Sequence, residues 1–285
     1  MESLSEKIKI LVFVDWYYPA YKAGGPIRSI INLIDHLHEE FEFYVVTSDR
    51  DLGDVRSMNQ ISVNQWVSLN NAKVIYLTPR SQRKRIYRSL FNEVKPHVIY
   101  FNSLFSLKFM LLPFKVLNKE NVKVVIAPRG MLGKESLKIK KTKKQLFFML
   151  IKGFKFFNNV HWHASSEIEL KEVQNVFGKS IKSDVISNLP PTIINNTEKA
   201  YKEIGSINVL CVCRISPIKN LIFLFKVLNE LKIKIHLKII GPVEDQLYWK
   251  KCNKQINELP ANCRISFLGE KPTKQIREEI NINHL

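Results

Sequence analysis

The chain of 285 residues is 45% hydrophobic and 25% charged, which is typical of a globular protein and excludes a mainly disordered or collagen-like chain. Lysine and arginine exceed the acidic residues by 44 − 26 = 18, so the surface must be strongly basic. Such a surface favours anionic partners, namely phosphates, nucleic acid or an anionic membrane face. At about 150 residues per domain, the length predicts two domains.

The N-terminus and the hydropathy pattern indicate neither a signal peptide nor a membrane-spanning segment. The first residues, MESLSEKIKILVFV, begin with acidic and polar side chains and lack a small-residue cleavage site, unlike a signal peptide. No segment reaches the run of about 18 apolar residues that spans a bilayer. We therefore expect a cytoplasmic protein that can still adhere to the inner face of the cell membrane.

Short apolar runs alternate with helical patterns through the first two thirds of the chain. Expected strands cover 8–14, 43–47, 74–77, 98–102, 122–128 and 160–165, and expected helices cover 26–37, 81–94, 104–119, 140–157 and 166–176. Strands that alternate with helices predict parallel βαβ units in a doubly wound α/β sheet. The polar stretch 49–72 is interpreted as an irregular surface excursion.

A stretch rich in Pro, Asn, Ser and Thr, 187–206, separates this series from a second one. There, strands are expected at 208–213, 235–241 and 264–269, with helices at 221–231, 244–258 and 273–281. We therefore divide the chain into a Rossmann-like domain (1–190), a linker (191–206) and a second, incomplete Rossmann-like domain (207–285). Such domains bind ligands at the C-terminal ends of their strands, so residues there are the candidates for chemistry.

The cysteines and histidines give no sign of a metal site. The four cysteines are Cys211, Cys213, Cys252 and Cys263. They form no CxxC pair, so zinc is not expected, and we interpret them as buried core thiols in a reducing cytosol. Cys211 and Cys213 are two residues apart, which puts them on one face of a strand. His161 and His163 alternate along an expected strand, where most histidines are structural.

Gly24 and Gly25 follow the first expected strand and directly precede the helix that Pro26 opens. Glycines let a backbone approach a ligand closely, and a helix N-terminus favours an anion. The pair is not a GxGxxG motif, and no acidic residue closes the second expected strand as dinucleotide binding requires. A simple strand-to-helix turn explains the two glycines equally well.

Cations also stand at expected strand ends. Arg214 and Lys219 are five residues apart after the first strand of the second domain. Arginine can bind a diphosphate in a bidentate way and lysine can act as a point charge, so the pair could clamp such a group. Their position favours this interpretation over solvated loop charges. Arg129 and Gly130, in APRG at 127–130, also follow an expected strand, although a surface loop explains them as well.

The stretch 134–155 carries eight lysines and one glutamate, a net charge of +7. Apolar residues recur at helical spacing along it and just beyond: Leu146, Met149, Leu150, Phe154 and Phe157. A basic amphipathic helix is typical of a membrane-surface element. An ordinary helix with its apolar stripe in the core shows the same pattern, so both interpretations stay open.

Several segments, in order along the chain, resemble bacterial GT4-type glycosyltransferases of the GT-B class, which use activated sugars. YYPAYKAGGPIRSI resembles the glycine-rich first loop and helix of that family, and VVIAPRGML resembles its SPRGML segment. HASSEIELKEV and VISNLPPTI stand where the family has a Ser-Glu helix start and a PNG turn. VCRISPIKN resembles the GR…K element, with Cys213 in the place of glycine, and LKIIGP and RISFLGE resemble two later strand ends.

The resemblance implies a GT-B-like fold, with the acceptor on the first domain and the nucleotide sugar on the second. It implies sugar transfer with retained configuration and without a bound metal or other cofactor. Arg214 and Lys219 would neutralise the departing diphosphate, which Gly24 and Gly25 would also face. Arg129 would lie near the transferred sugar as the catalytic candidate.

The resemblance also implies residues that line the ligand cleft: Gly130, Asn188, Gly241 and Pro242. The resemblance implies that the acceptor is a lipid-linked glycan in the synthesis of a surface polysaccharide such as lipopolysaccharide or capsule. An anionic membrane surface would then contact the basic segment 138–157. No nucleic acid is expected as a partner, because the lysines lack interleaved aromatic motifs and no docking element is evident.

One departure from the family concerns the end of the second domain. Family members continue into a Glu-x7-Glu segment that binds the sugar and the ribose, whereas this sequence runs only 285 − 206 = 79 residues beyond the linker. The alternative hypothesis is therefore a truncated, catalytically inactive remnant that binds a membrane or a partner.

Overall fold

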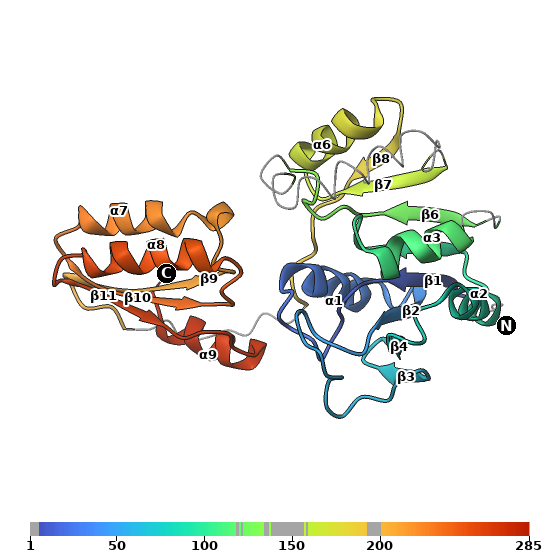
Figure 1. Cartoon of the computed structure of the whole chain (residues 1–285), viewed down its shortest axis with the longest axis horizontal. Helices are drawn as coiled ribbons and strands as arrows, with labels where there is room; N and C mark the ends of the chain where they lie inside the picture. Colours follow the sequence, from blue (N-terminus) through green and yellow to red (C-terminus); the bar gives the residue numbers. More distant parts are fainter. Residues whose placement is uncertain are drawn as a thin grey trace. The chain divides into compact units, whose positions relative to one another are not determined.

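The chain divides into two compact units, residues 1–193 (unit 1) and 194–285 (unit 2), which are described separately (Figure 1). A computed structural model describes residues 6–117, 120, 122–133, 137, 157, 159–192 and 201–284. The expected basic helix therefore lies outside the described residues, apart from Phe157. The expected linker spans the division between the units. Within the described ranges, no helix is both long and apolar enough to cross a membrane.

The described part of unit 1 is built around one eight-stranded sheet, in the order β3-β4-β2-β1-β5-β6-β7-β8. The strands are β1 (Ile8–Phe13), β2 (Phe41–Ser48), β3 (Trp66–Leu69), β4 (Ala72–Leu77), β5 (Val98–Phe101), β6 (Lys123–Ile126), β7 (Val160–Ala164) and β8 (Lys182–Val185). Neighbouring strands are parallel, except that β3 runs antiparallel to β4. The expected doubly wound α/β class is confirmed.

Helices cover both faces of this sheet. They are α1 (Gly25–Leu37), α2 (Lys84–Val94), the π-helix η1 (Leu107–Leu111), α3 (Leu112–Leu117) and α6 (Glu167–Phe177). Leu11 and Phe13 of β1 face a core shared with α2, α3 and α6, whereas Val12 faces a core shared with Ile30 and Ile34 of α1. Because each face of β1 packs on helices, the strand is apolar on both faces from residue 10 to residue 13. This burial puts β1 and its neighbours at the centre of the unit.

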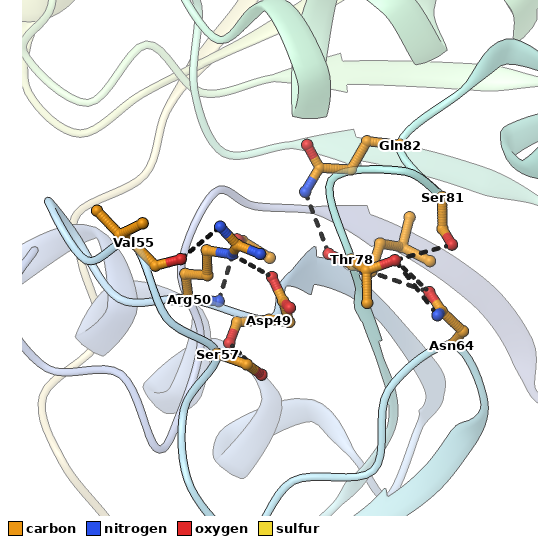
Figure 2. Close-up of polar contacts among 10 residues, drawn as sticks. Asp49, Arg50, Val55, Ser57, Asn64, Thr78, Ser81 and Gln82 are labelled. Atoms are coloured by element: carbon orange, nitrogen blue, oxygen red, sulfur yellow. Dashed lines mark hydrogen bonds and ion pairs between the residues drawn. The ribbon is translucent and has the colours of Figure 1, made fainter.

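The stretch 49–72 is irregular and mostly exposed up to residue 65, as expected, but its last part forms a strand. This strand is β3 (Trp66–Leu69). Before it, polar contacts join residues near 50–57 to the end of β2 and join Asn64 to the end of β4, as Figure 2 shows. The buried Asp49 accepts from Arg50 Nε at 3.1 Å, and Arg50 Nη1 donates to the carbonyl of Val55 at 2.5 Å. Asn64 Oδ1 accepts from the backbone N–H of Thr78 at 3.2 Å. These contacts are between polar groups, so the polar sequence of this stretch did not reveal them.

Two further elements of unit 1 differ from the expectation. β8 was not expected, because its sequence KSDV has no apolar run; as an edge strand it needs only the main-chain ladder to β7. The helix expected at 104–119 is shorter and begins as η1, in which the N–H of Leu111 bonds the carbonyl of Ser106 at 2.9 Å. π-turns of this kind occur frequently at functional sites.

The described part of unit 2 has a parallel sheet of three strands in the order β11-β10-β9. Its elements are β9 (Ser206–Val212), the 3₁₀ turn η2 (Pro217–Lys219), α7 (Leu221–Asn229), β10 (Lys234–Ile240), α8 (Gln246–Asn257), β11 (Cys263–Phe267) and α9 (Thr273–Ile282). Helices α7 and α8 lie on one face and α9 on the other (Figure 1). On the α9 face, Lys238 Nζ lies 2.8 Å from Glu279 Oε2.

The expectation of four buried thiols was wrong for three of them. Cys252 is fully buried between α7, α8 and the sheet, but Cys211, Cys213 and Cys263 are only partly buried. The described part of unit 2 has three strands, so β9 is an edge strand and its side chains stay partly accessible. Cys211, in β9, and Cys213, directly after the strand, do lie on one side, with their sulfur atoms 3.7 Å apart.

Candidate functional site

Polar side chains gather at the C-terminal ends of four neighbouring strands of unit 1. We call the group Tyr100, Asn102, Arg129, His163 and Asn188 the Arg129 cluster. Tyr100 and Asn102 stand at the end of β5, Arg129 follows β6, His163 lies in β7 and Asn188 follows β8. C-terminal ends of parallel strands meet at one edge of a sheet, which is where α/β proteins bind ligands. The cluster joins two residues singled out in the sequence, Arg129 and Asn188, to three that were not.

The guanidinium of Arg129 donates to three neutral oxygens. Its Nε lies 2.7 Å from Asn102 Oδ1, its Nη1 lies 2.6 Å from Asn188 Oδ1 and its Nη2 lies 2.8 Å from Tyr100 Oη. The backbone of Arg129 is left-handed, with φ 55°, a conformation that costs a non-glycine residue about 1–3 kcal/mol. The three bonds hold the side chain in place without neutralising its charge. A half-buried, oriented cation results, suited to an anion or an electron-rich oxygen.

Behind Arg129, Tyr100 and His163 form a chain of hydrogen bonds with one direction. His163 Nε2 lies 2.8 Å from the carbonyl of Ile186, which can only accept, so this nitrogen carries the proton. His163 Nδ1 therefore accepts from Tyr100 Oη at 2.8 Å, and the phenol oxygen accepts from Arg129. Burial lowers the pKa of His163 and raises the pKa of Tyr100 to about 12, so both groups stay neutral at pH 7.

The turn that carries Arg129 is fixed from the other side by Glu169. This carboxylate is 3% exposed and lies in the first turn of α6. Its Oε1 accepts from the N–H of Gly130 at 2.5 Å, and its Oε2 accepts from the N–H and the hydroxyl of Ser165, both at 2.6 Å. Gly130, with φ 71°, is exposed at the surface of the edge. Glu169 thus positions Arg129 by holding the backbone of the next residue. Its place in a helix gave no sign of this role.

The glycine turn lies beside this cluster. Gly24 has φ 66° and ψ −115°, a conformation that strongly favours glycine, and it precedes α1 with Pro26 in the first turn. A Cβ added to Gly24 or Gly25 would meet nothing within 4 Å, so open space lies next to the helix N-terminus. Asn102 Nδ2 donates to the carbonyl of Pro26 at 2.9 Å. Asn102 therefore links the start of α1 to Arg129.

In unit 2, Arg214 and Lys219 follow β9, as the sequence indicated. Arg214 Nη1 lies 2.8 Å from Glu244 Oε1, and both side chains are exposed. Lys219 ends η2 and is also exposed. The structure thus places both cations on one strand-to-helix connection and adds an acidic partner, Glu244, that the sequence pattern did not indicate.

Gly241 and Pro242, also singled out in the sequence, close β10 against the same connection. Gly241 has φ 145°, and a Cβ there would lie 2.0 Å from the carbonyl oxygen of Cys213, so only glycine fits. The carbonyl of Pro242 accepts from the N–H of Ile215 at 2.8 Å. Gly241 and Pro242 therefore shape the loop that carries Arg214.

Asp15, which the sequence pattern did not single out, lies at the same edge of the unit 1 sheet, after β1. Asp15 comes two residues after the buried strand β1, and its Oδ1 accepts from Ser106 Oγ at 2.5 Å. Burial raises the pKa of this carboxyl, although hydrogen bonds from Ser106 and Ser103 oppose the shift. The signal was present, since an acidic residue directly after an apolar strand has to find partners when the strand end is buried.

Comparisons with known proteins agree with the fold. No protein-family model matches the sequence, and no curated protein matches it either. HepE of Anabaena in complex with UDP-glucose superimposes with a TM-score of 0.62 at 16% identity, covering 93% of this chain and 69% of that one. The lipopolysaccharide outer core galactosyltransferase WaaB, in its apo form, gives 0.53 at 15% identity, covering 96% and 71%.

A third structure, the catalytic domain of starch synthase IV from Arabidopsis thaliana bound to ADP and acarbose, gives a TM-score of 0.58 at 12% identity, covering 98% of this chain and 77% of that one. At these identities the likeness defines the fold. The chain has a GT-B-like fold of two α/β units, as the sequence predicted.

Proposed function

We propose that the chain is a glycosyltransferase that moves a sugar from a nucleotide-sugar donor to a glycan acceptor. The observation that carries the proposal is the Arg129 cluster, an oriented cation that donates to neutral oxygens beside the glycine turn of α1, in a chain with a GT-B-like fold. HepE and WaaB, which share the fold, are respectively a UDP-glucose complex and a galactosyltransferase. The GT4-like segments of the sequence favour transfer with retained configuration.

Unit 2 is proposed to bind the donor, with Arg214 and Lys219 on its diphosphate. In the transfer, the bond between the sugar's anomeric carbon and the diphosphate breaks, and the acceptor hydroxyl bonds to that carbon while its proton passes to a diphosphate oxygen. Two cations at the diphosphate would stabilise the charge that develops there, so the proposal invokes no metal. Glu244, which pairs with Arg214, would be displaced or shared when the diphosphate binds.

Unit 1 is proposed to act on the sugar. Arg129 would contact the transferred sugar or the departing oxygen, and the exposed backbone of Gly24 and Gly25 would let a phosphate approach the N-terminus of α1. Gly130 and Asn188 would line the same site. In this scheme Tyr100 and His163 do not touch the substrate; they position Arg129 through the hydrogen bonds described above.

The acceptor is proposed to be lipid-linked and the protein to work at the cytoplasmic face of a membrane. This part rests on the basic amphipathic pattern of 138–157 and on the GT4-like segments. Replacing lysines between 138 and 144 should weaken co-sedimentation with anionic vesicles, by roughly fivefold for each lysine lost. Unchanged co-sedimentation would favour the alternative interpretation, in which this segment is an ordinary helix with its apolar stripe in the core.

The experiment that tests the proposed activity is calorimetry with UDP, GDP and ADP, followed by an assay for nucleotide release from the matching sugar donors. Binding of one nucleotide diphosphate with turnover of its sugar form is the expected result. Failure of a folded sample to bind any of the three would instead favour a protein without transferase activity.

A further inference from the structure

Two thiols of unit 2 lie side by side directly before Arg214. Cys211 is the second-last residue of β9, and Cys213 follows the end of the strand, with the two sulfur atoms 3.7 Å apart. Both side chains are partly buried at the margin of the apolar core that α7 and α8 form with the sheet. Cys252, deeper in the same core, is fully buried. A small reagent from solvent therefore reaches the pair more easily than it reaches Cys252.

The geometry of the pair is compatible with a disulfide. Residues i and i+2 of an extended strand have Cα atoms about 6.4–6.8 Å apart, which is the upper end of the range that a disulfide spans. The chain bends at Cys213, so the two side chains converge, and their sulfur atoms are already in contact. Only a further approach to about 2.05 Å is needed for a bond.

The two thiols differ in acidity, and this difference assigns them separate roles. The S–H of Cys213 donates to the sulfur of Cys211; this bond and the nearby charge of Lys219 lower the pKa of Cys211 to about 7, against the opposing effect of burial. The same hydrogen bond and burial raise the pKa of Cys213. The thiolate is the form that reacts with an oxidant, so Cys211 reacts first and Cys213 second.

We propose that Cys211 and Cys213 form a reversible disulfide with hydrogen peroxide as the oxidant, and that this bond shifts the connection that carries Arg214. The Cys211 thiolate attacks one peroxide oxygen, the O–O bond breaks, and the departing hydroxide takes up a proton to give water. The sulfur of Cys213 then attacks the sulfenic acid at Cys211, the S–O bond breaks, and the departing hydroxide takes the Cys213 proton as a second water. Two electrons pass from the two sulfur atoms to the peroxide.

The backbone around the pair explains why the bond acts on Arg214 and why it is reversible. The N–H of Cys213 donates to the carbonyl of Ile240 at 2.9 Å, and the N–H of Ile215 donates to the carbonyl of Pro242 at 2.8 Å. Drawing the sulfur atoms together pulls on this clamped segment, in which Arg214 lies between the two bonded residues. A strained, accessible disulfide of this kind is readily reduced, and transient redox-sensing disulfides also occur in reducing compartments.

The test treats the full chain with excess hydrogen peroxide and then counts and maps its thiols. The four thiols should fall to two, and dithiothreitol should restore both. The tryptic peptide 203–214, which contains the pair and no other cysteine, should become lighter by two hydrogens. Cys263→Ser is the matched control and should lose the same two thiols, because its sulfur lies elsewhere, 3.5 Å from the carbonyl of Leu228.

Two variants separate the steps. Cys213→Ser should stop at a sulfenic acid at Cys211, which dimedone traps, and Cys211→Ser should form no disulfide at all. Circular dichroism checks the fold of each variant. Survival of all four thiols in the folded wild type, or a disulfide to Cys252, to Cys263 or to a second copy of the chain, would overturn the proposal.

The effect on the connection is measured in two ways. In the oxidised chain, the N–H groups of Cys213 and Ile215 should exchange with solvent about tenfold faster, and this readout needs no nucleotide. Unchanged exchange would contradict the shift of the connection. UDP should also bind about tenfold more weakly after oxidation, an expectation that rests on the proposed function. A chain that forms the disulfide and shows the faster exchange, but binds UDP in neither form, would contradict the proposed function alone.

Discussion

The two arginines singled out in the sequence are held in opposite ways. Arg129 in unit 1 is half-buried and donates to three neutral oxygens, two from amides and one from a phenol. Arg214 in unit 2 is exposed and pairs with the carboxylate of Glu244. The Arg129 side chain is therefore held in one orientation by groups that do not neutralise its charge. The Arg214 side chain is exposed, and Glu244 neutralises its charge.

The difference indicates that the two arginines have different functions. A cation that is fixed by hydrogen bonds to neutral oxygens needs no reorganisation to stabilise charge that develops nearby, which is the property that accelerates a reaction. An exposed ion pair has to exchange its partner when a ligand arrives, and it contributes little stability by itself. This contrast supports the proposal that Arg129 acts in the chemical step and Arg214 in donor binding, and the following predictions test that division.

The largest effect is expected for Arg129→Ala. Removing one preorganised charge at a reacting centre costs about 10²–10³ in kcat, so sugar transfer should fall by that factor while the Kd for UDP stays within about twofold. Steady-state kinetics and calorimetry on the same preparation measure both. A variant that loses UDP affinity and turnover together would place Arg129 on the donor diphosphate and erase the contrast with Arg214.

A substitution in the loop behind Arg214 should cost stability rather than chemistry. Gly241→Ala puts a Cβ 2.0 Å from a backbone carbonyl at φ 145°, and we expect it to destabilise unit 2 by about 3 kcal/mol in denaturant unfolding. Gly24→Ala is the matched control, because it strains the backbone but enters open space, and its cost should be about 1 kcal/mol. Equal costs for the two would contradict the packing described for unit 2.

Arg214 and its partner should act on the donor in opposite directions. Arg214→Ala should weaken UDP binding about ten- to a hundredfold, because a charge-assisted bond to the diphosphate is lost. Glu244→Gln removes the competing carboxylate and should tighten binding by roughly two- to threefold. Calorimetry at two salt concentrations measures both variants. Weaker binding in Glu244→Gln would mean that the carboxylate supports the donor site instead of competing for it.

The smallest effect concerns pH and the group behind Arg129. Burial lowers the pKa of His163 from its ordinary value of 6.5, so below pH 6.5 the unfolded chain binds a proton that the folded chain resists. Stability should therefore fall as the pH drops from 6.5 toward the folded pKa. Arg129, Glu169 and His161 also act on this ring, so the comparison is made with His163→Gln, which keeps a donor and an acceptor. The variant should flatten this part of the melting profile; an unchanged slope would show that His163 does not titrate there.

The sequence predicted the elements that are apolar and the residues that end them. Runs such as Ile8–Phe13 show their burial directly, and the cations at strand ends follow from that pattern. Strands β3 and β8 escaped notice because edge strands are stabilised by main-chain bonds, which carry no side-chain signature. Two residues that bind Arg129, Tyr100 and Asn102, and the link from Tyr100 to His163 also escaped notice. Tyr100 and His163 are 63 residues apart, and only the order of strands in the sheet brings them together.

The central proposal is that Arg129 in unit 1 acts on the sugar of a donor whose nucleotide is bound by unit 2. Its most direct test measures nucleotide release from a sugar donor by the wild-type chain and by Arg129→Ala, alongside UDP binding by calorimetry. We predict that both proteins bind UDP with similar affinity and that only the wild type releases nucleotide at a measurable rate. Equal release by the two proteins, at equal UDP affinity, would contradict the role assigned to Arg129.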